Sequence, residues 1–412
     1  MRRWILTSPL IVLAVTLAVA ASTYGDGSSG TPAVQPAPGC SIATASGPNL
    51  GWANPTFTTV GAGPFGVAAA RGYAFVANAA GKLDVLADHD SAPHLIHTVP
   101  LPGPAGLGMT ITQDGRYLVI ADGGDGADVV DVAMAEAGDA HAVLGTLRGR
   151  SAQGAGGGAI ETAVSRDGRY AFVSLEDSAE VAVYNLASAI ADHFDKSSYV
   201  GAIPTGLAPV GLAVSPNGRW LYSTSEIAGR STITGRIRRR LTARDGSLSA
   251  ISVGAAEHHP ARSVIATVSA GCSPVRVAVS PSGNQVWVDA RESDELLAFS
   301  SARLRSHAND PELAIVRVGE APVGLAVVDG GSRVIVADSN RFDAAGEHAA
   351  LTLVNIGAAL AHRAAIVGTI RAGLFPRDMA LEPAGTVLLV SNFGSGTLEA
   401  VHVVDHAQES HH

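Results

Sequence analysis

The sequence predicts an all-β protein, a seven-bladed β-propeller with four antiparallel strands in each blade. Three observations predict it: seven copies of one segment, a turn glycine in each copy, and an N-terminal strand that supplies what the last copy lacks. The chain has 412 residues, of which 47% are hydrophobic and only 16% are charged. It therefore has enough apolar material for a large core and lacks the composition of a disordered chain.

The repeat consists of a short apolar strand, a turn that resembles Pro-Asp-Gly, and a second apolar strand. Clear copies start at Pro209 (Pro-Val-Gly-Leu-Ala-Val-Ser-Pro-Asn-Gly) and at Pro274 (Pro-Val-Arg-Val-Ala-Val-Ser-Pro-Ser-Gly). The turn glycines of the seven copies are Gly72, Gly115, Gly168, Gly218, Gly283, Gly331 and Gly385. Their spacing of 43 to 65 residues is typical of propeller blades that carry loop insertions.

Each copy reads as four strands. The turn supplies the residues that a tight hairpin needs. The second strand is a continuous apolar run such as Tyr170–Val173, which predicts burial on both faces. The third strand alternates, as in Glu180–Tyr184, and the fourth has a Val-Gly-Thr-Ile pattern, as in Val143–Leu147 and Ile366–Ile370.

The last copy predicts how the ring closes. Its third strand is Thr397–Val404, and the chain then ends without a fourth. Thr56–Val60 at the other end of the chain has the pattern of the fourth strand Ile366–Ile370. We therefore expect the N-terminal strand to complete the last blade, because a closed ring leaves no long unpaired edge.

The N-terminus predicts export. Met1-Arg2-Arg3 is followed by an apolar run from Trp4 to Ala21 that contains a small-residue cleavage site, Ala18-Val19-Ala20. Residues 1–21 thus read as a signal peptide, and the alternative is an uncleaved anchor, since the run has about the minimum length of a span. We expect a secreted or periplasmic protein without a transmembrane span in the mature chain. The Ala-, Gly- and Val-rich, lysine-poor composition indicates a bacterial source.

The remaining chain divides into three parts. Residues 22–48 are rich in Gly, Ser and Pro and predict a flexible tether, residues 49–406 the propeller, and residues 407–412 a disordered tail. The two cysteines, Cys40 and Cys272, form an even count in a protein expected to meet an oxidising compartment. A disulfide would fix the tether to the propeller, and the alternative is two free or partly buried thiols.

The repeat unit Pro-x-Gly-x-Ala-Val-Ser-Pro-x-Gly, followed by an apolar run and by Ala77-Asn78 or Ala337-Asp338, resembles the YVTN-repeat propellers. It is also similar to the lactonase-like seven-bladed propellers. The resemblance covers about residues 56 to 405 and implies the fold, whereas these families include surface proteins, binding scaffolds and sugar-lactone hydrolases. The lactonase branch tends to carry histidines at the start of a middle blade, where this chain has Ile160-Glu161-Thr162.

The resemblance implies that the first strand of each blade lines a central channel. The third position of the repeat is then occupied by Gly66, Gly108, Glu161, Gly211, Arg276, Gly324 and Asp378. The charged members Glu161, Arg276 and Asp378, with Arg377 beside them, are our candidates for a ligand-binding or acid–base site. The alternative is a structural cluster in which buried charges satisfy one another.

Other polar clusters are weaker candidates. Asp122, Asp125 and Asp128 could offer oxygen ligands to calcium, but their spacing does not match an established calcium loop, and solvated hairpin residues are the alternative. We expect neither a metal nor a cofactor. An insertion from Gly229 to Asp245 is basic and could bind an anionic cell-surface polymer, or simply be an exposed hairpin. Its arginines include Arg236, Arg238, Arg239 and Arg240.

The net charge of −9 disfavours nucleic acid as a partner. We expect a monomeric, exported propeller that acts as a binding or interaction scaffold for a protein or a cell-envelope ligand. The alternative is a lactonase-type hydrolase that uses the channel carboxylates and Arg276. Mutual contact among these three side chains would favour the hydrolase.

Overall fold

The structure is a computed structural model, and it describes residues 40, 44–87, 93–149, 157–228, 245–306, 310–341 and 349–404. Residues 36–412 form one compact unit, which contains the propeller. The predicted signal peptide, the tether up to residue 39, the arginines of the 229–244 insertion and the tail lie outside the described residues.

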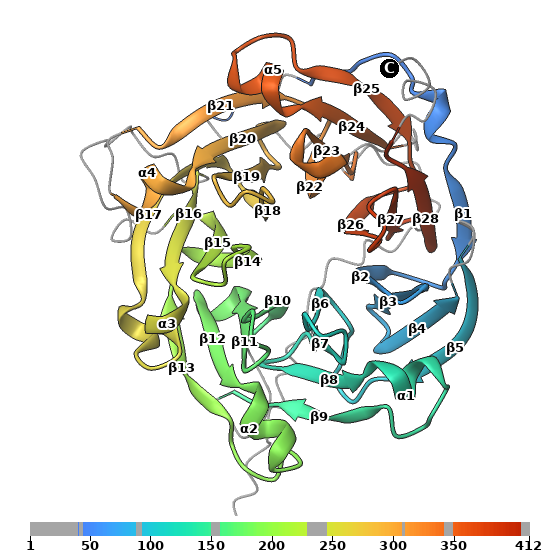
Figure 1. Ribbon diagram of the computed structural model, residues 1–412, viewed down its shortest axis with the longest axis vertical. Helices are drawn as coiled ribbons and strands as arrows, with labels where there is room; N and C mark the ends of the chain where they lie inside the picture. Colours follow the sequence, from blue (N-terminus) through green and yellow to red (C-terminus); the bar gives the residue numbers. More distant parts are fainter. Residues whose placement is uncertain are drawn as a thin grey trace, which may run out of the picture. The chain divides into compact units, whose positions relative to one another are not determined.

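The described residues form seven four-stranded antiparallel sheets, arranged as the blades of a propeller (Figure 1). Blade 1 contains β2 (Pro64–Ala70), β3 (Tyr73–Asn78), β4 (Lys82–Ala87) and β5 (His94–Pro100). Blade 2 contains β6 (Met109–Ile111), β7 (Tyr117–Ala121), β8 (Ala127–Asp131) and β9 (Val143–Leu147). Blade 3 contains β10 (Ala159–Val164), β11 (Tyr170–Leu175), β12 (Glu180–Asn185) and β13 (Tyr199–Pro204).

The remaining blades follow the same order. Blade 4 contains β14 (Leu207–Val214), β15 (Trp220–Ile227), β16 (Asp245–Ser252) and β17 (Val264–Cys272). Blade 5 contains β18 (Pro274–Val279), β19 (Gln285–Ala290), β20 (Glu295–Ser300) and β21 (Glu312–Arg317). Blade 6 contains β22 (Pro322–Val328), β23 (Arg333–Asp338), β24 (Ala350–Asn355) and β25 (Ile366–Arg371). Blade 7 contains β26 (Pro376–Leu381), β27 (Val387–Asn392), β28 (Thr397–His402) and β1 (Thr56–Thr59).

The composition of blade 7 confirms the predicted closure of the ring. β1 pairs antiparallel with β28, in a register that places Thr56 opposite Ala400 and Thr59 opposite Thr397. Figure 1 shows the first strand, in blue, at the outer edge of the sheet formed by the red C-terminal strands. The two ends of the described chain therefore share one blade.

Adjacent blades approach closely because the third position of the first strand is often glycine. A Cβ atom added to Gly66 would collide with the carbonyl oxygen of Leu107 in the chain leading to blade 2. One added to Gly211 would collide with the carbonyl oxygen of Val275 in blade 5. Where this position is not glycine, a charged side chain lies at the centre of the ring.

Hydroxyl groups on second strands also join neighbouring blades. Ser174 Oγ donates to the carbonyl oxygen of Val210 at 2.8 Å, and Thr224 Oγ1 donates to that of Val275 at 2.8 Å. Ser391 makes the equivalent bond to Phe65 and so connects blade 7 to blade 1. Each bond satisfies a buried polar group and fixes one first strand against the preceding blade.

Short helices follow the third strands of blades 2 to 6, and the sequence analysis did not predict them. They are α1 (Val132–Glu136), α2 (Leu186–Ala191), α3 (Val253–Ala256), α4 (Ser301–Arg305) and α5 (Ile356–Leu360). Each helix begins after an N-cap residue whose side chain accepts a hydrogen bond from a backbone N–H of the first turn. These N-cap residues are Asp131, Asn185, Ser252, Ser300 and Asn355. No helix of the described chain is long and apolar enough to cross a membrane.

The chain before β1 crosses the outer edge of several blades. Ala45 N donates to Val318 O at 2.7 Å, beside blade 5, and Thr369 N in β25 donates to Pro48 O at 2.8 Å. Leu50 N returns a bond to Thr369 O at 2.8 Å. The flexible tether predicted up to residue 48 is therefore wrong for its last residues, which are hydrogen-bonded to the propeller.

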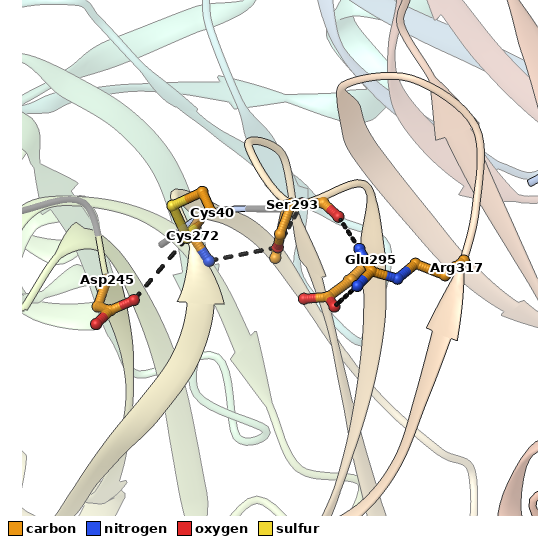
Figure 2. The surroundings of a disulfide bond; sticks show 7 residues. Cys40, Asp245, Cys272, Ser293, Glu295 and Arg317 are labelled. Carbon is orange, nitrogen blue, oxygen red and sulfur yellow. Dashed lines mark hydrogen bonds and ion pairs between the residues drawn. A yellow bond between two sulfur atoms is a disulfide. The ribbon is translucent and has the colours of Figure 1, made fainter. Parts of the chain in front are cut away.

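Cys40 and Cys272 are joined by a disulfide, with their Cα atoms 6.0 Å apart. Both cysteines are buried, and Cys272 is the last residue of β17 (Figure 2). The bridge spans 232 positions of sequence, so it fixes the N-terminal segment to blade 4 in addition to its contacts with blades 5, 6 and 7. We call residues 44–55 the N-terminal strap.

Replacing both cysteines by serine is expected to lower the free energy of unfolding by about 2–4 kcal/mol, because the unfolded chain regains the freedom that a long closed loop removes. Guanidinium denaturation of the wild type and of the Cys40→Ser/Cys272→Ser variant measures the difference. Dithiothreitol should lower the midpoint of the wild type to that of the variant and leave the variant unchanged. Equal midpoints for the two proteins without dithiothreitol would contradict the stabilising role of the bridge.

Candidate functional site

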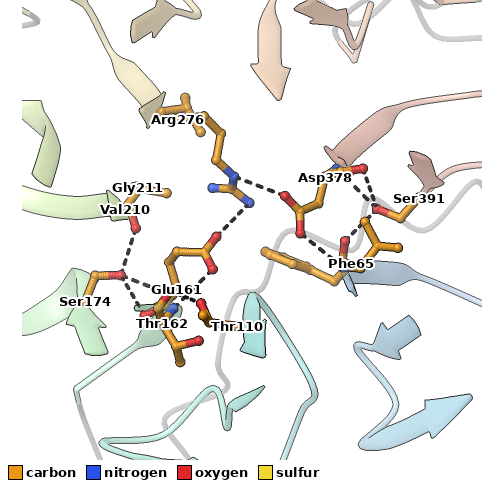
Figure 3. A network of polar contacts seen from close by, with 12 residues as sticks. Phe65, Thr110, Glu161, Thr162, Ser174, Val210, Gly211, Arg276, Asp378 and Ser391 are labelled. Carbon is orange, nitrogen blue, oxygen red and sulfur yellow. Dashed lines mark hydrogen bonds and ion pairs between the residues drawn. The ribbon is translucent and has the colours of Figure 1, made fainter. Parts of the chain in front are cut away.

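Three charged side chains from three separate blades meet at the centre of the ring. Glu161 lies on β10, Arg276 on β18 and Asp378 on β26, each at the third position of the repeat. Arg276 Nη2 lies 3.5 Å from Glu161 Oε2, and Arg276 Nε lies 3.8 Å from Asp378 Oδ1. Figure 3 shows the guanidinium group between the two carboxyl groups. The structure thus brings together the three channel residues that the repeat pattern singles out.

Burial raises the pKa values of the two carboxyl groups of this cluster. Glu161 and Arg276 are only 7% and 6% exposed. Burial raises the pKa of Glu161 to about 8, against the attraction of Arg276 and with a further contribution from Asp378. Burial also raises the pKa of Asp378, again opposed by Arg276. Burial thus favours the protonated form of each carboxyl group, whereas the Arg276 guanidinium favours the ionised form.

Backbone groups and Asp289 hold the cluster in place. Glu161 Oε1 accepts a bond from Thr162 N at 3.1 Å, and Asp378 Oδ2 accepts one from Val67 N at 3.1 Å. Asp289 Oδ1 on β19 accepts a hydrogen bond from Arg276 N at 2.6 Å. In blades 3, 4 and 7 the equivalent backbone N–H donates to a serine or threonine hydroxyl instead. Burial raises the pKa of Asp289 to about 7. The sequence analysis missed Asp289, although it is the only carboxylate at this position of the repeat.

The fourth candidate residue, Arg377, lies against aromatic rings and not against carboxyl groups. Its guanidinium carbon lies 3.7 Å from the ring centroid of Phe65, 5.3 Å from that of Phe375 and 5.6 Å from that of Phe393. Arg341 lies 5.0 Å from the same Phe375 ring. The sequence analysis did not predict these three phenylalanines, because Phe375 and Phe393 lie outside the strands that the repeats align.

More charged side chains surround the same end of the channel. They lie at or beside the turns between second and third strands, which emerge on one face of a propeller. Arg291 Nη2 is paired with Glu226 Oε2 at 2.8 Å, between blades 5 and 4. Burial, and then Glu226 and Asp177, raise the pKa of Glu176 in blade 3. We define the channel mouth by Glu176, Glu226, Arg291, Arg341, Phe375, Arg377 and Phe393.

The aspartates of blade 2 are structural. Asp122 Oδ1 accepts bonds from Gly124 N and Gly126 N, and Asp128 accepts from Gly103 N and Thr146 Oγ1. Asp122, Asp125 and Asp128 are all at most 8% exposed, so their interpretation as solvated hairpin residues is wrong. In the part of the chain that the structure describes, no group of three His, Cys, Asp or Glu side chains is placed to hold a metal ion.

The central blades of the propeller resemble a known protein family in sequence. Residues 108–306, just under half of the chain, match the family model "Lactonase, 7-bladed beta-propeller". The chain is lactonase-like. This confirms the resemblance that the repeats predict, and the match includes Glu161 and Arg276 but not Asp378. No curated protein matches the lactonase-like chain in sequence.

Solved structures share the fold of this lactonase-like propeller. Kuenenia stuttgartiensis hydrazine synthase is 16% identical with a TM-score of 0.63, covering 84% of this chain and 97% of that chain. A chain of a mitotic checkpoint complex is 13% identical with a TM-score of 0.62, covering 93% and 98%. The Cps50 (Swd1) propeller domain of Myceliophteria thermophila is 13% identical with a TM-score of 0.60, covering 85% and 100%. At these identities the likeness concerns the fold alone.

Proposed function

We propose that this protein is an exported binding propeller that takes its ligand at the channel mouth. The observation that carries the proposal is the convergence of arginines, carboxylates and phenylalanines from blades 3 to 7 at one end of the channel. Ligand sites combine an apolar surface with a few converging polar groups, and the mouth offers both. The regular blades act as the scaffold that holds these side chains.

Export is part of this proposal. The apolar N-terminal run and its cleavage site support it, and so does the Cys40–Cys272 disulfide, since disulfides persist in oxidising compartments. Fractionation of expressing bacteria, with N-terminal sequencing of the product, tests it. We expect a periplasmic or secreted chain that begins close to residue 22. A cytoplasmic, full-length product would contradict export.

The binding site is tested by thermal shift on a panel of sugar lactones, calcium and anionic glycans. We expect at least one compound to raise the melting temperature of the wild type and to lose that effect in Phe393→Ala, which removes one ring of the mouth. Phe57→Ala is the matched control, because Phe57 is 46% exposed on the outer strand β1. A shift that survives in Phe393→Ala, or no shift at all, would contradict the proposed site.

A second function is favoured by the contact of Arg276 with both Glu161 and Asp378, because two neighbouring carboxyl groups, with the pKa of Glu161 raised by burial, can serve acid–base chemistry. In a lactonase-type reaction, Asp378 would take a proton from the water that adds to the lactone carbonyl, the ring C–O bond would break, and Glu161 would protonate the departing oxygen. Ring opening by the wild type, lost in Glu161→Gln, would support this alternative. Equal rates in both proteins would exclude it.

A further inference from the structure

Arg377 is a cation without a carboxylate partner. Among the described residues, no carboxylate oxygen lies within ion-pair distance of it, and its buried Nε has no hydrogen-bond partner. Its contacts are the faces of Phe65, Phe375 and Phe393. Arg276 and Arg291, by contrast, each face an acidic side chain.

The phenyl rings offset only part of the cost of this arrangement. A cation over an aromatic face is stabilised only modestly, whereas the removal of a charged group from water without a paired charge costs much more. Arg377 is partly buried, so it bears a share of that cost. The three phenyl rings therefore leave part of the cost of burying this charge without compensation.

The neighbouring charges add to the positive potential. Burial and then Arg276, Arg341 and Arg291 lower the pKa of Arg377, and Asp378 opposes them. Glu161 and Asp378 both contact Arg276, and neither lies within ion-pair distance of Arg377. Blades 5, 6 and 7 thus give their side of the mouth an excess of positive charge.

We propose that the channel mouth binds a small oxyanion, a carboxylate or a phosphate group, through the guanidinium edge of Arg377. This inference rests on the proposed binding function and names the chemistry of its ligand. A guanidinium group presents two parallel N–H donors to such an anion, and the rings of Phe65, Phe375 and Phe393 fix the plane in which they point. The anion would supply the missing counter-charge.

Calorimetric titration of the purified protein with inorganic phosphate and with citrate, in low-salt buffer at pH 7, tests the inference. We expect at least one anion to bind the wild type and at least ten-fold weaker binding to Arg377→Gln, the loss of about one charge-assisted interaction. Arg377→Lys keeps the charge without the fork and should bind with intermediate affinity. Arg116→Gln is the matched control, because Arg116 also lies over an aromatic ring, Tyr117, but outside the mouth.

Each outcome decides the question. Binding of phosphate alone or of citrate alone supports the site and identifies the source of the oxyanion. Equal binding by the wild type and Arg377→Gln, or no binding of either anion by the wild type, would overturn the inference. If neither anion binds but a neutral compound stabilises the wild type and not Phe393→Ala, the oxyanion inference fails while the binding function stands. Because Arg377→Lys keeps the cation, it covers the case in which Arg377→Gln does not fold.

Discussion

Replacing Arg276 by methionine is expected to lower the free energy of unfolding by about 3–5 kcal/mol at pH 8, because breaking a buried ion pair leaves uncompensated charge. Arg276 is 6% exposed and is the cation that contacts both Glu161 and Asp378. Methionine fills a similar volume, so the loss measures the missing charge rather than a cavity. Denaturant unfolding of both proteins at pH 8 gives the difference.

The same variant should recover stability in acid. Without Arg276, the pKa values of Glu161 and Asp378 lie further above their unfolded values, so the folded state binds more protons than the unfolded one. Its stability then falls as the pH rises from about 4 through the folded pKa values, and the difference from the wild type shrinks as the pH is lowered from 8 to 5. Adding Glu161→Gln and Asp378→Asn should restore much of the loss at pH 8. A loss independent of pH and of these two changes would show that Arg276 acts through packing alone.

Removing residues 1–62 is expected to have a still larger effect and to leave no stable monomeric propeller. The truncation deletes β1, the N-terminal strap and Cys40 together, and it exposes the edge of β28. An open edge strand is a template for pairing with another chain, so we expect aggregation or association in place of cooperative unfolding. Size-exclusion chromatography and calorimetry measure both outcomes.

Removing residues 1–39 is the matched control for this truncation. It keeps Cys40, the strap and β1, and should melt within a few degrees of the full chain. A folded, monomeric protein without residues 1–62 would contradict the view that β1 closes the ring.

The sequence predicted the architecture well because propeller repeats are nearly independent units. Seven turn glycines and the offset of Thr56–Val60 from the last copy were enough to predict seven blades and the closing strand. The helices after the third strands were missed, since five-residue helices such as α1 carry little periodicity. Their recurring N-cap residues, Asp131 among them, were the available signal.

The site was predicted only in part, for a geometric reason. Glu161, Arg276 and Asp378 share one repeat position, so alignment of the copies places them on one ring. Asp289 supports that ring from a second strand, and Phe375 and Phe393 lie in connections where the repeats do not align. Contacts between such connections depend on how the blades pack, and no local pattern encodes them.

Hydrogen–deuterium exchange, with the compound that most raises the melting temperature, tests the central claim most directly. The account predicts slower exchange in the peptides that contain Phe375 to Asp378 and Phe393, at the channel mouth, and unchanged exchange in the outer strands β5 and β13. Protection confined to the outer strands or to the turns at the opposite end of the channel would contradict it.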